Sequence, residues 1–309
     1  VLAAVRKNGM LLECASDALR ADREVVLKAV AEFGHALQYA SEELKGDRHV
    51  VLAAVKEFGY ALQHASEEMK ADRDVVTAAI RHSDIDALLY ASKELRGDRH
   101  VVMAAVKKDA RALRYASAQV RADKEVVMRA LRSSGCALRH ASDELRADKD
   151  VVLAAVRKNG MLLECASDAL RADREVVLKA VAEFGHALQY ASEELKGDRH
   201  VVLAAVKEFG YALQHASEEM KADRDVVTAA IRHSDIDALL YASKELRGDR
   251  HVVMAAVKKD ARALRYASAQ VRADKEVVMR ALRSSGCALR HASDELRADK
   301  DVVLAAVRK

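Results

Sequence analysis

Pairs of side chains four residues apart recur along the chain and hold the residue types that could do chemistry. Cys136 and His140 have the types of a nucleophile and its base, and Met161 and Cys165 follow one repeat later as soft donors suited to copper(I) or zinc. A zinc site would need four good ligands, and methionine is a poor one. The Cys–His pair has no apparent third group to orient it. Metal binding and catalysis therefore stay open as alternatives, and we assign no catalytic residue, metal ligand or cofactor.

The same two positions elsewhere hold mainly aromatic and imidazole side chains. On an α-helix, residues i and i+4 lie on one face, so stacked repeats are expected to align these side chains into a stripe. Two interpretations remain open: partly buried packing against the next helix, or a contact surface for protein partners with Tyr as the anchor. The predicted interaction stripe consists of His35, Tyr39, Tyr60, His64, Tyr90, Tyr115 and His140.

The joins between repeats form a second candidate, because each carries basic residues around an aspartate, as in Lys45, Asp47 and Arg48. Aligned cations could hold phosphate or an acidic partner, whereas nearby carboxylates favour a solvated, salt-bridged edge. The chain contains no glycine-rich phosphate loop. Its 52 basic residues nearly balance 48 acidic ones, for a net charge of +4, so we expect no nucleic-acid partner.

Short helices must position these side chains. In residues 22–46, Asp22 is a good N-cap, and Val25, Val26, Ala29, Val30 and Phe33 recur at helical spacing as one apolar arc. Gly34 is expected to end this helix in the left-handed conformation. A second helix should follow, with Leu37, Ala40, Ser41 and Leu44 on one face and Gly46 at its end. Recurring Ala-Ser pairs such as Ala40 and Ser41 are expected to let neighbouring backbones approach closely.

This unit occurs about twelve times in the chain. Residues 152–302 repeat residues 1–151 without change, and residues 303–309 begin a third copy. We therefore expect one continuous array over residues 1–309: an all-α solenoid of about twelve two-helix repeats of roughly 25 residues. The third repeat has one residue more, and its segment His82–Asp86 is expected to bulge outward as a loop.

The repeat also resembles a known family. The phrase D-R-E-V-V-L-K-A-V…G-x-A-L-x-x-A-S-E-E-L, and above all residues 47–71, is similar to the tandem helical repeat of the domain-of-unknown-function family number 4116. The resemblance covers essentially the whole chain. It implies a multi-repeat helical protein, of a kind that includes some bacterial effectors. It implies no activity and transfers no catalytic residue.

A structural role fits these observations best. We expect a non-enzymatic repeat scaffold, a segment of a longer self-associating filament or tube; the alternative is a soluble protein- or peptide-binding module, effector-like or a consensus design. No apolar stretch is long enough to span a membrane. Both ends fall within a helix, so we expect an excerpt of a longer array. Self-assembly should use apolar side chains expected to be exposed there: Val1, Leu2, Val5, Val302, Val303 and Val307.

Overall fold

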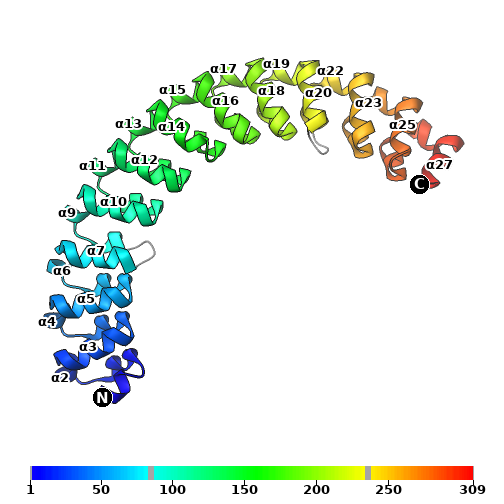
Figure 1. Ribbon diagram of the computed structural model, residues 1–309. Helices are drawn as coiled ribbons and strands as arrows, with labels where there is room; N and C mark the ends of the chain where they lie inside the picture. Colours follow the sequence, from blue (N-terminus) through cyan, green and yellow to red (C-terminus); the bar gives the residue numbers. More distant parts are fainter. Residues whose placement is uncertain (1, 83–86, 234–237, 309) are drawn as a thin grey trace. The chain divides into compact units, whose positions relative to one another are not determined.

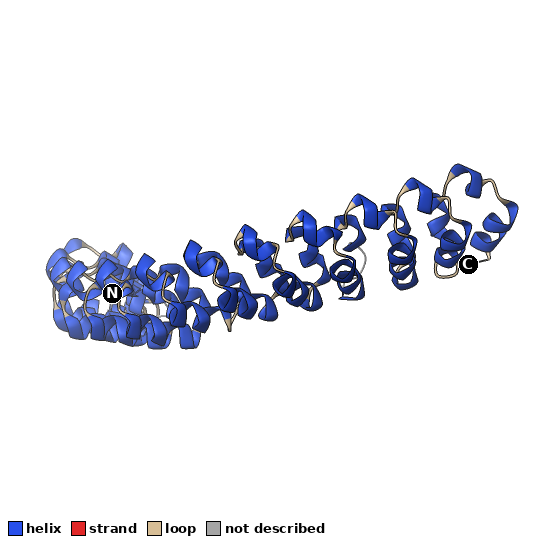
Figure 2. Ribbon diagram, turned by 90° about the horizontal axis from the view of Figure 1, so that it is seen from above, coloured by secondary structure: helices blue, strands red, loops and turns tan. Residues whose placement is uncertain are grey.

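The computed structural model describes residues 2–82, 87–233 and 238–308, which form two compact units, Val1–Ala155 and Val156–Lys309. These residues form helices joined by short turns, and none of the part described lies in a strand (Figure 2). The predicted all-α solenoid with repeats of about 25 residues is confirmed. The residues 83–86, which carry most of the expected loop of the third repeat, lie outside the described residues.

In the first unit, the long helices lie side by side, and the short helices that precede them follow one edge (Figure 1). The long α-helices are α3 (Arg23–Glu32), α5 (Arg48–Glu57), α7 (Arg73–His82), α10 (Arg99–Lys108), α12 (Lys124–Ser133) and α14 (Lys149–Val156), whose last residue belongs to the second unit. The 3₁₀-helices are η1 (Gly9–Cys14), η2 (Gly34–Tyr39), η3 (Gly59–His64), η4 (Ala110–Tyr115) and η5 (Gly135–His140). The short α-helices are α1 (Leu2–Val5), α2 (Asp17–Arg20), α4 (Glu42–Lys45), α6 (Glu67–Ala71), α8 (Ala87–Tyr90), α9 (Lys93–Arg96), α11 (Ala118–Arg121) and α13 (Asp143–Arg146).

The second unit repeats this order because its sequence is the same. Its long helices are α16 (Arg174–Glu183), α18 (Arg199–Glu208), α20 (Arg224–His233), α23 (Arg250–Lys259), α25 (Lys275–Leu282) and α27 (Lys300–Val307). Its 3₁₀-helices are η6 (Gly160–Cys165), η7 (Gly185–Tyr190), η8 (Gly210–His215), η9 (Ala261–Tyr266) and η10 (Gly286–His291). Its short helices are α15 (Asp168–Arg171), α17 (Glu193–Lys196), α19 (Glu218–Ala222), α21 (Ala238–Tyr241), α22 (Lys244–Arg247), α24 (Ala269–Arg272) and α26 (Asp294–Arg297).

The aspartate before a long helix can serve two repeats at once, as Asp47 does. Asp47 Oδ1 accepts a hydrogen bond from the backbone N–H of Val50 at 3.1 Å, which caps α5. Asp47 Oδ2 accepts a second one from Arg23 Nε of the preceding repeat at 2.8 Å. The hydrogen bond from Arg23 is the main reason that the pKa of Asp47 is lowered. The same carboxylate therefore begins one helix and ties it to its neighbour.

The second helix of each repeat consists of two pieces. In the first repeat, η2 ends before Ala40, whose backbone is extended (φ −67°, ψ 156°), and α4 begins after Ser41. Ser41 Oγ accepts from the N–H of Leu44 at 3.4 Å, so Ser41 is the N-cap of α4. Its own N–H donates to the carbonyl oxygen of Arg20, one repeat earlier, at 3.0 Å. The serine that was expected inside a helix thus interrupts it and bonds to the previous repeat.

Gly34 does not have the expected left-handed conformation, since no described glycine has a positive φ. It begins η2 instead, and a β-carbon added there would lie 2.4 Å from the carbonyl oxygen of Ala54 in the next repeat. Close approach of two backbones is therefore the reason for glycine at this position.

The apolar core lies between the long helices and the second helices. Val25, Val26, Ala29 and Val30 are buried, as expected, and full burial of a Val side chain is worth roughly 1.5–3 kcal/mol. Phe33 is instead 41% exposed, because it follows α3 in an extended conformation that turns it away from the apolar arc.

The expected exposure of terminal apolar side chains is wrong for Val5 and Val302, which are fully buried. Val302 lies in the first turn of α27, which packs on α25, just as the paired valines of the other long helices pack inward. Val307 is 78% exposed.

Candidate functional site

Aromatic and imidazole rings of the first unit gather around His35. Its ring centroid lies 4.7 Å from that of His64, 5.8 Å from that of Phe58, 6.0 Å from that of Phe33 and 6.2 Å from that of Tyr60. Tyr60 in turn meets the ring of Tyr90 edge to face, with centroids 5.1 Å apart. These distances lie in the range of favourable aromatic pairs. We call this set, Phe33, His35, Phe58, Tyr60, His64 and Tyr90, the aromatic row.

Three consecutive repeats build the row. His35 is the second residue of η2, Tyr60 is the second residue of η3, and Tyr90 is the last residue of α8. Stacking of η2 on η3 brings these positions together. The second unit has the same row, in which His186 lies 4.7 Å from His215 and Tyr211 lies 5.0 Å from Tyr241.

The phenylalanines give the row an exposed apolar edge. Phe33 and Phe58 are 41% and 45% exposed, and their counterparts Phe184 and Phe209 are both 44% exposed. A shallow pocket of ≈ 400 Å³ lies over this edge in the first unit, lined by Phe33, Gly34, His35, Glu57, Phe58 and Tyr60. This exposed apolar edge is the candidate contact surface of the first unit.

The imidazole of His64 is held in its neutral form at neutral pH. Burial, followed by the nearby charges of His35, Lys45 and Lys70, lowers the pKa of His64 to about 4. His215 has a pKa of about 4 for the same reasons. His64 is therefore neutral in the folded chain. Its Nε2 and the Nδ1 of His35 are buried without a hydrogen-bond partner.

The remaining residues of the predicted stripe lie among charged side chains. Burial, followed by the charge of Glu13, raises the pKa of Tyr39. The ring of Tyr115 lies 4.3 Å below the guanidinium of Arg114. Burial and then nearby arginines, Arg114 first, lower the pKa of His140.

The 3₁₀ geometry explains why the predicted pairs diverge. His35 and Tyr39 both lie in η2, and a 3₁₀-helix has three residues per turn. Residues four apart therefore point in different directions, whereas they would share a face on an α-helix. In the structure, the ring at the first position of a pair contacts rings at both positions of the pair in the next repeat, as His35 contacts Tyr60 and His64.

The candidate thiol chemistry has no supporting geometry in the described residues. The four cysteines form no disulfide bond in the described residues: Cys14, Cys136 and Cys287 are exposed, and Cys165 is partly buried. In the part of the chain that the structure describes, no three His, Cys, Asp or Glu side chains come together in a way that could hold a metal ion.

The basic residues at the joins are engaged within the stack. Arg48 Nε donates to Asp72 at 2.9 Å and its Nη2 donates to Asp74 at 2.6 Å, while Lys45 pairs with Glu42 at 2.7 Å. The salt-bridged edge is thus the interpretation that the geometry favours over a phosphate site.

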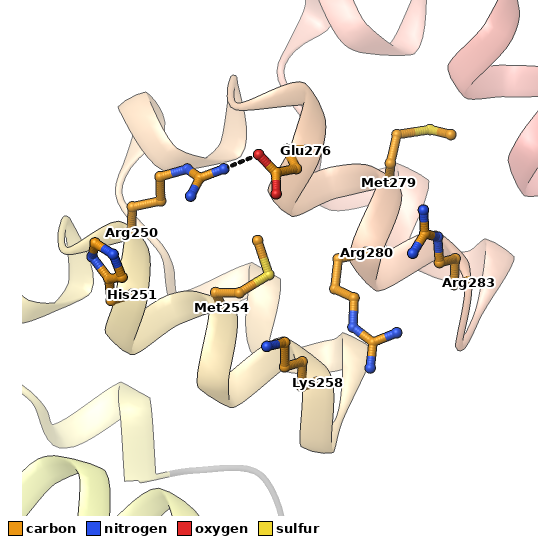
Figure 3. A pocket seen from close by; sticks show the side chains of 8 residues that line it. All are labelled: Arg250, His251, Met254, Lys258, Glu276, Met279, Arg280 and Arg283. Carbon is orange, nitrogen blue, oxygen red and sulfur yellow. Dashed lines mark hydrogen bonds and ion pairs between the residues drawn. The ribbon is translucent and has the colours of Figure 1, made fainter.

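A basic pocket of ≈ 510 Å³ between α23 and α25 was not expected from the sequence (Figure 3). The signal that could have found it is a cation at the penultimate position of successive long helices. In the first unit these are Lys56, Arg81, Lys107 and Arg132. The recurrence is easily missed, because acidic residues occur close by in the sequence and hide the excess of positive charge.

The fold and these surfaces define an all-α tandem-repeat protein of the solenoid type. None of the helices described is long and apolar enough to cross a membrane. The model of one family, described as "Domain of unknown function (DUF4116)", matches residues 1–45, 47–96, 82–121, 123–171, 173–221, 198–245, 223–272 and 274–309. The chain therefore belongs to this family, as the resemblance of its repeat indicated. No curated protein matches it.

Proposed function

We propose that this chain is a non-catalytic structural scaffold that associates with further copies of itself. Several polar side chains of the repeat contribute to the helices and to the contacts between repeats. Ser41 caps α4, and Asp47 caps α5 while it accepts from Arg23. His64 is neutral and packed against His35. These side chains hold neighbouring repeats together. Their use for this purpose supports a structural role for the stacked repeats.

The observation that carries self-association is that each chain has two copies of the exposed aromatic row. A patch that pairs with a like patch joins two chains. A chain with two such patches can bind a partner at each, so that association continues into filaments or closes into rings. A chain with one patch stops at a dimer. The identical sequences of the two units make the two contacts identical.

Particle size in solution tests this proposal. We expect the chain to form concentration-dependent assemblies, visible by light scattering and electron microscopy. Phe33→Ser with Phe58→Ser removes one patch and should stop assembly at dimers. Adding Phe184→Ser and Phe209→Ser should give monomers.

A matched control replaces exposed leucines outside the aromatic row. Leu89 and Leu240 are 39% and 38% exposed, and the variant Leu89→Ser with Leu240→Ser should assemble as the unchanged chain does. A chain that stays monomeric at high concentration would refute self-association. Equal loss of assembly in the control would show that the aromatic row is not the contact.

The second candidate is a peptide-binding module, and the pocket of ≈ 400 Å³ beside Phe33 and Phe58 favours it. The aromatic side chains would then hold an apolar residue of a peptide rather than another copy. A monomeric chain that binds an apolar peptide, and loses it in the Phe33→Ser variant, would support this function in place of self-association.

A further inference from the structure

The basic pocket lies between α23 and α25, two consecutive long helices of the second unit. Met254 extends from α23 into the space between the helices, and Met279 lies on α25 (Figure 3). The two methionines give the pocket an apolar part. Its volume of ≈ 510 Å³ exceeds what a single small anion needs.

Positive charge surrounds this apolar part. Arg250 is already engaged, since it donates to Asp274 at 2.9 Å and also pairs with Glu276. Lys258, Arg280 and Arg283 have no carboxylate partner among the residues that the structure describes. Glu276 is the single acidic side chain of the lining.

Arg280 carries an unused hydrogen-bond donor. Its Nε is buried and has no acceptor, so the group has lost water without gaining a protein partner. A buried donor left without an acceptor destabilises the fold, and more so when it is charged. An external carboxylate would pair instead with the terminal nitrogens of this pocket-lining guanidinium, because Arg binds carboxylates with two parallel hydrogen bonds.

The first unit holds the same arrangement. Arg99 pairs there with Asp123 at 2.8 Å and with Glu125, as Arg250 does with its own partners. The Nε of Arg129, which corresponds to Arg280, is likewise buried without an acceptor. Met103, Met128, Lys107 and Arg132 complete the corresponding set. The first unit thus holds the residues of a corresponding site.

We propose that each basic pocket binds an acidic segment of a partner protein, in which carboxylates flank an apolar side chain. The carboxylates would pair with Lys258, Arg280 and Arg283, and the apolar side chain would contact Met254 and Met279. Flexible methionines adapt to apolar side chains of varied shape. This inference goes beyond the proposed scaffold function and does not depend on self-association.

The lining favours an acidic peptide over a nucleic acid. Proteins that bind single strands stack bases on aromatic side chains between the basic residues. The ring in this lining is that of His251, and its apolar side chains are those of Met254 and Met279. A phosphodiester chain would leave that apolar part without a contact.

Fluorescence anisotropy with the full chain at low salt tests the proposal. The probes are a short labelled peptide in which Glu alternates with Leu, its analogue with Gln in place of Glu, and an oligothymidine of equal charge. We expect the acidic peptide to bind at least tenfold more tightly than the neutral one. The variant Arg129→Gln with Arg280→Gln should weaken acidic-peptide binding about tenfold, the loss expected for a charged hydrogen-bonding partner.

The matched control is Lys93→Gln with Lys244→Gln, which removes the same charge from exposed positions of α9 and α22. It should change affinity less than twofold, and circular dichroism should show both variants folded. Equal loss in the two variants, tighter binding of the oligothymidine, or equal binding of the neutral peptide would each overturn the proposal. A monomeric chain that binds the acidic peptide as expected would refute self-association and leave this inference standing.

Discussion

Two glycines of one repeat should respond in opposite ways to alanine. A β-carbon on Gly34 would lie 2.4 Å from the carbonyl oxygen of Ala54 and 2.9 Å from Phe58 Cβ, so the next repeat must move. Overpacking of this kind costs about 1–3 kcal/mol. Alanine occurs at the same position as Ala110 in the fourth repeat, buried at 3% exposure, so we expect a strained joint rather than an unfolded chain.

Gly46 is the matched control. A β-carbon there would lie 3.3 Å from the carbonyl oxygen of Glu43, and its φ of −96° is one that alanine adopts readily. Ala122 holds the equivalent position with φ −94°. Replacement of Gly by Ala at such a position stabilises by about 0.4–1 kcal/mol, because the unfolded chain becomes less flexible.

Thermal unfolding followed by circular dichroism measures both effects, with each change made in both copies. Gly34→Ala with Gly185→Ala should lower Tm by about 4 °C or more, since each kcal/mol shifts Tm by roughly 2–4 °C in chains of comparable size. Gly46→Ala with Gly197→Ala should leave Tm unchanged or raise it slightly. Equal shifts of the same sign in the two variants would refute the close approach of Gly34 to the next repeat.

Two further predictions concern pH and the joints. Because His64 and His215 keep a pKa of about 4, only the unfolded chain takes up their protons as the pH falls from about 6.5 to 4, and the free energy of unfolding should fall in that window. A pKa shift of this size corresponds to at most ~3 kcal/mol of unfolding free energy per ring. Solvent screening at these partly exposed rings reduces this contribution to on the order of 1 kcal/mol. The denaturant midpoint should depend less on pH over this range in the variant His64→Gln with His215→Gln. An unchanged dependence on pH would contradict the assignment. Asp47→Ala with Asp198→Ala should cost about 1–2 kcal/mol per site through loss of the N-cap. The control Glu43→Ala with Glu194→Ala, at exposed positions, should cost little. Equal denaturant midpoints for the two variants would count against the dual role of Asp47.

The sequence was sufficient for the repeat and for most of its core. Asp before a Val-Val pair, followed by Ala and Val at helical spacing, predicts the capped long helix that α3 and α5 form. These signals are local, since a cap and its helix lie within four residues of one another. The resemblance of the whole repeat to its family depended on the same residues, and the family match bears it out.

The candidate site was predicted less well, because it depends on the geometry of the second helix. His35 and Tyr39 were expected on one face, and the three-residue turn of η2 separates them. Phe33 was expected in the apolar arc, and its extended backbone places it beside His35 instead, as that of Phe58 does. No local signal distinguishes a 3₁₀ turn from an α turn over six residues.

The sequence by itself thus determined the period, the helix starts and the buried valines, because neighbours in the chain decide these. Tertiary structure alone decided that Ser41 interrupts the second helix, since its N–H bonds to Arg20 of the previous repeat. It also decided that Gly34 is needed for its small size, and that Arg280 and Lys258 share a pocket across two helices. Each of these depends on residues a full repeat apart, and their distance is fixed only when the repeats stack.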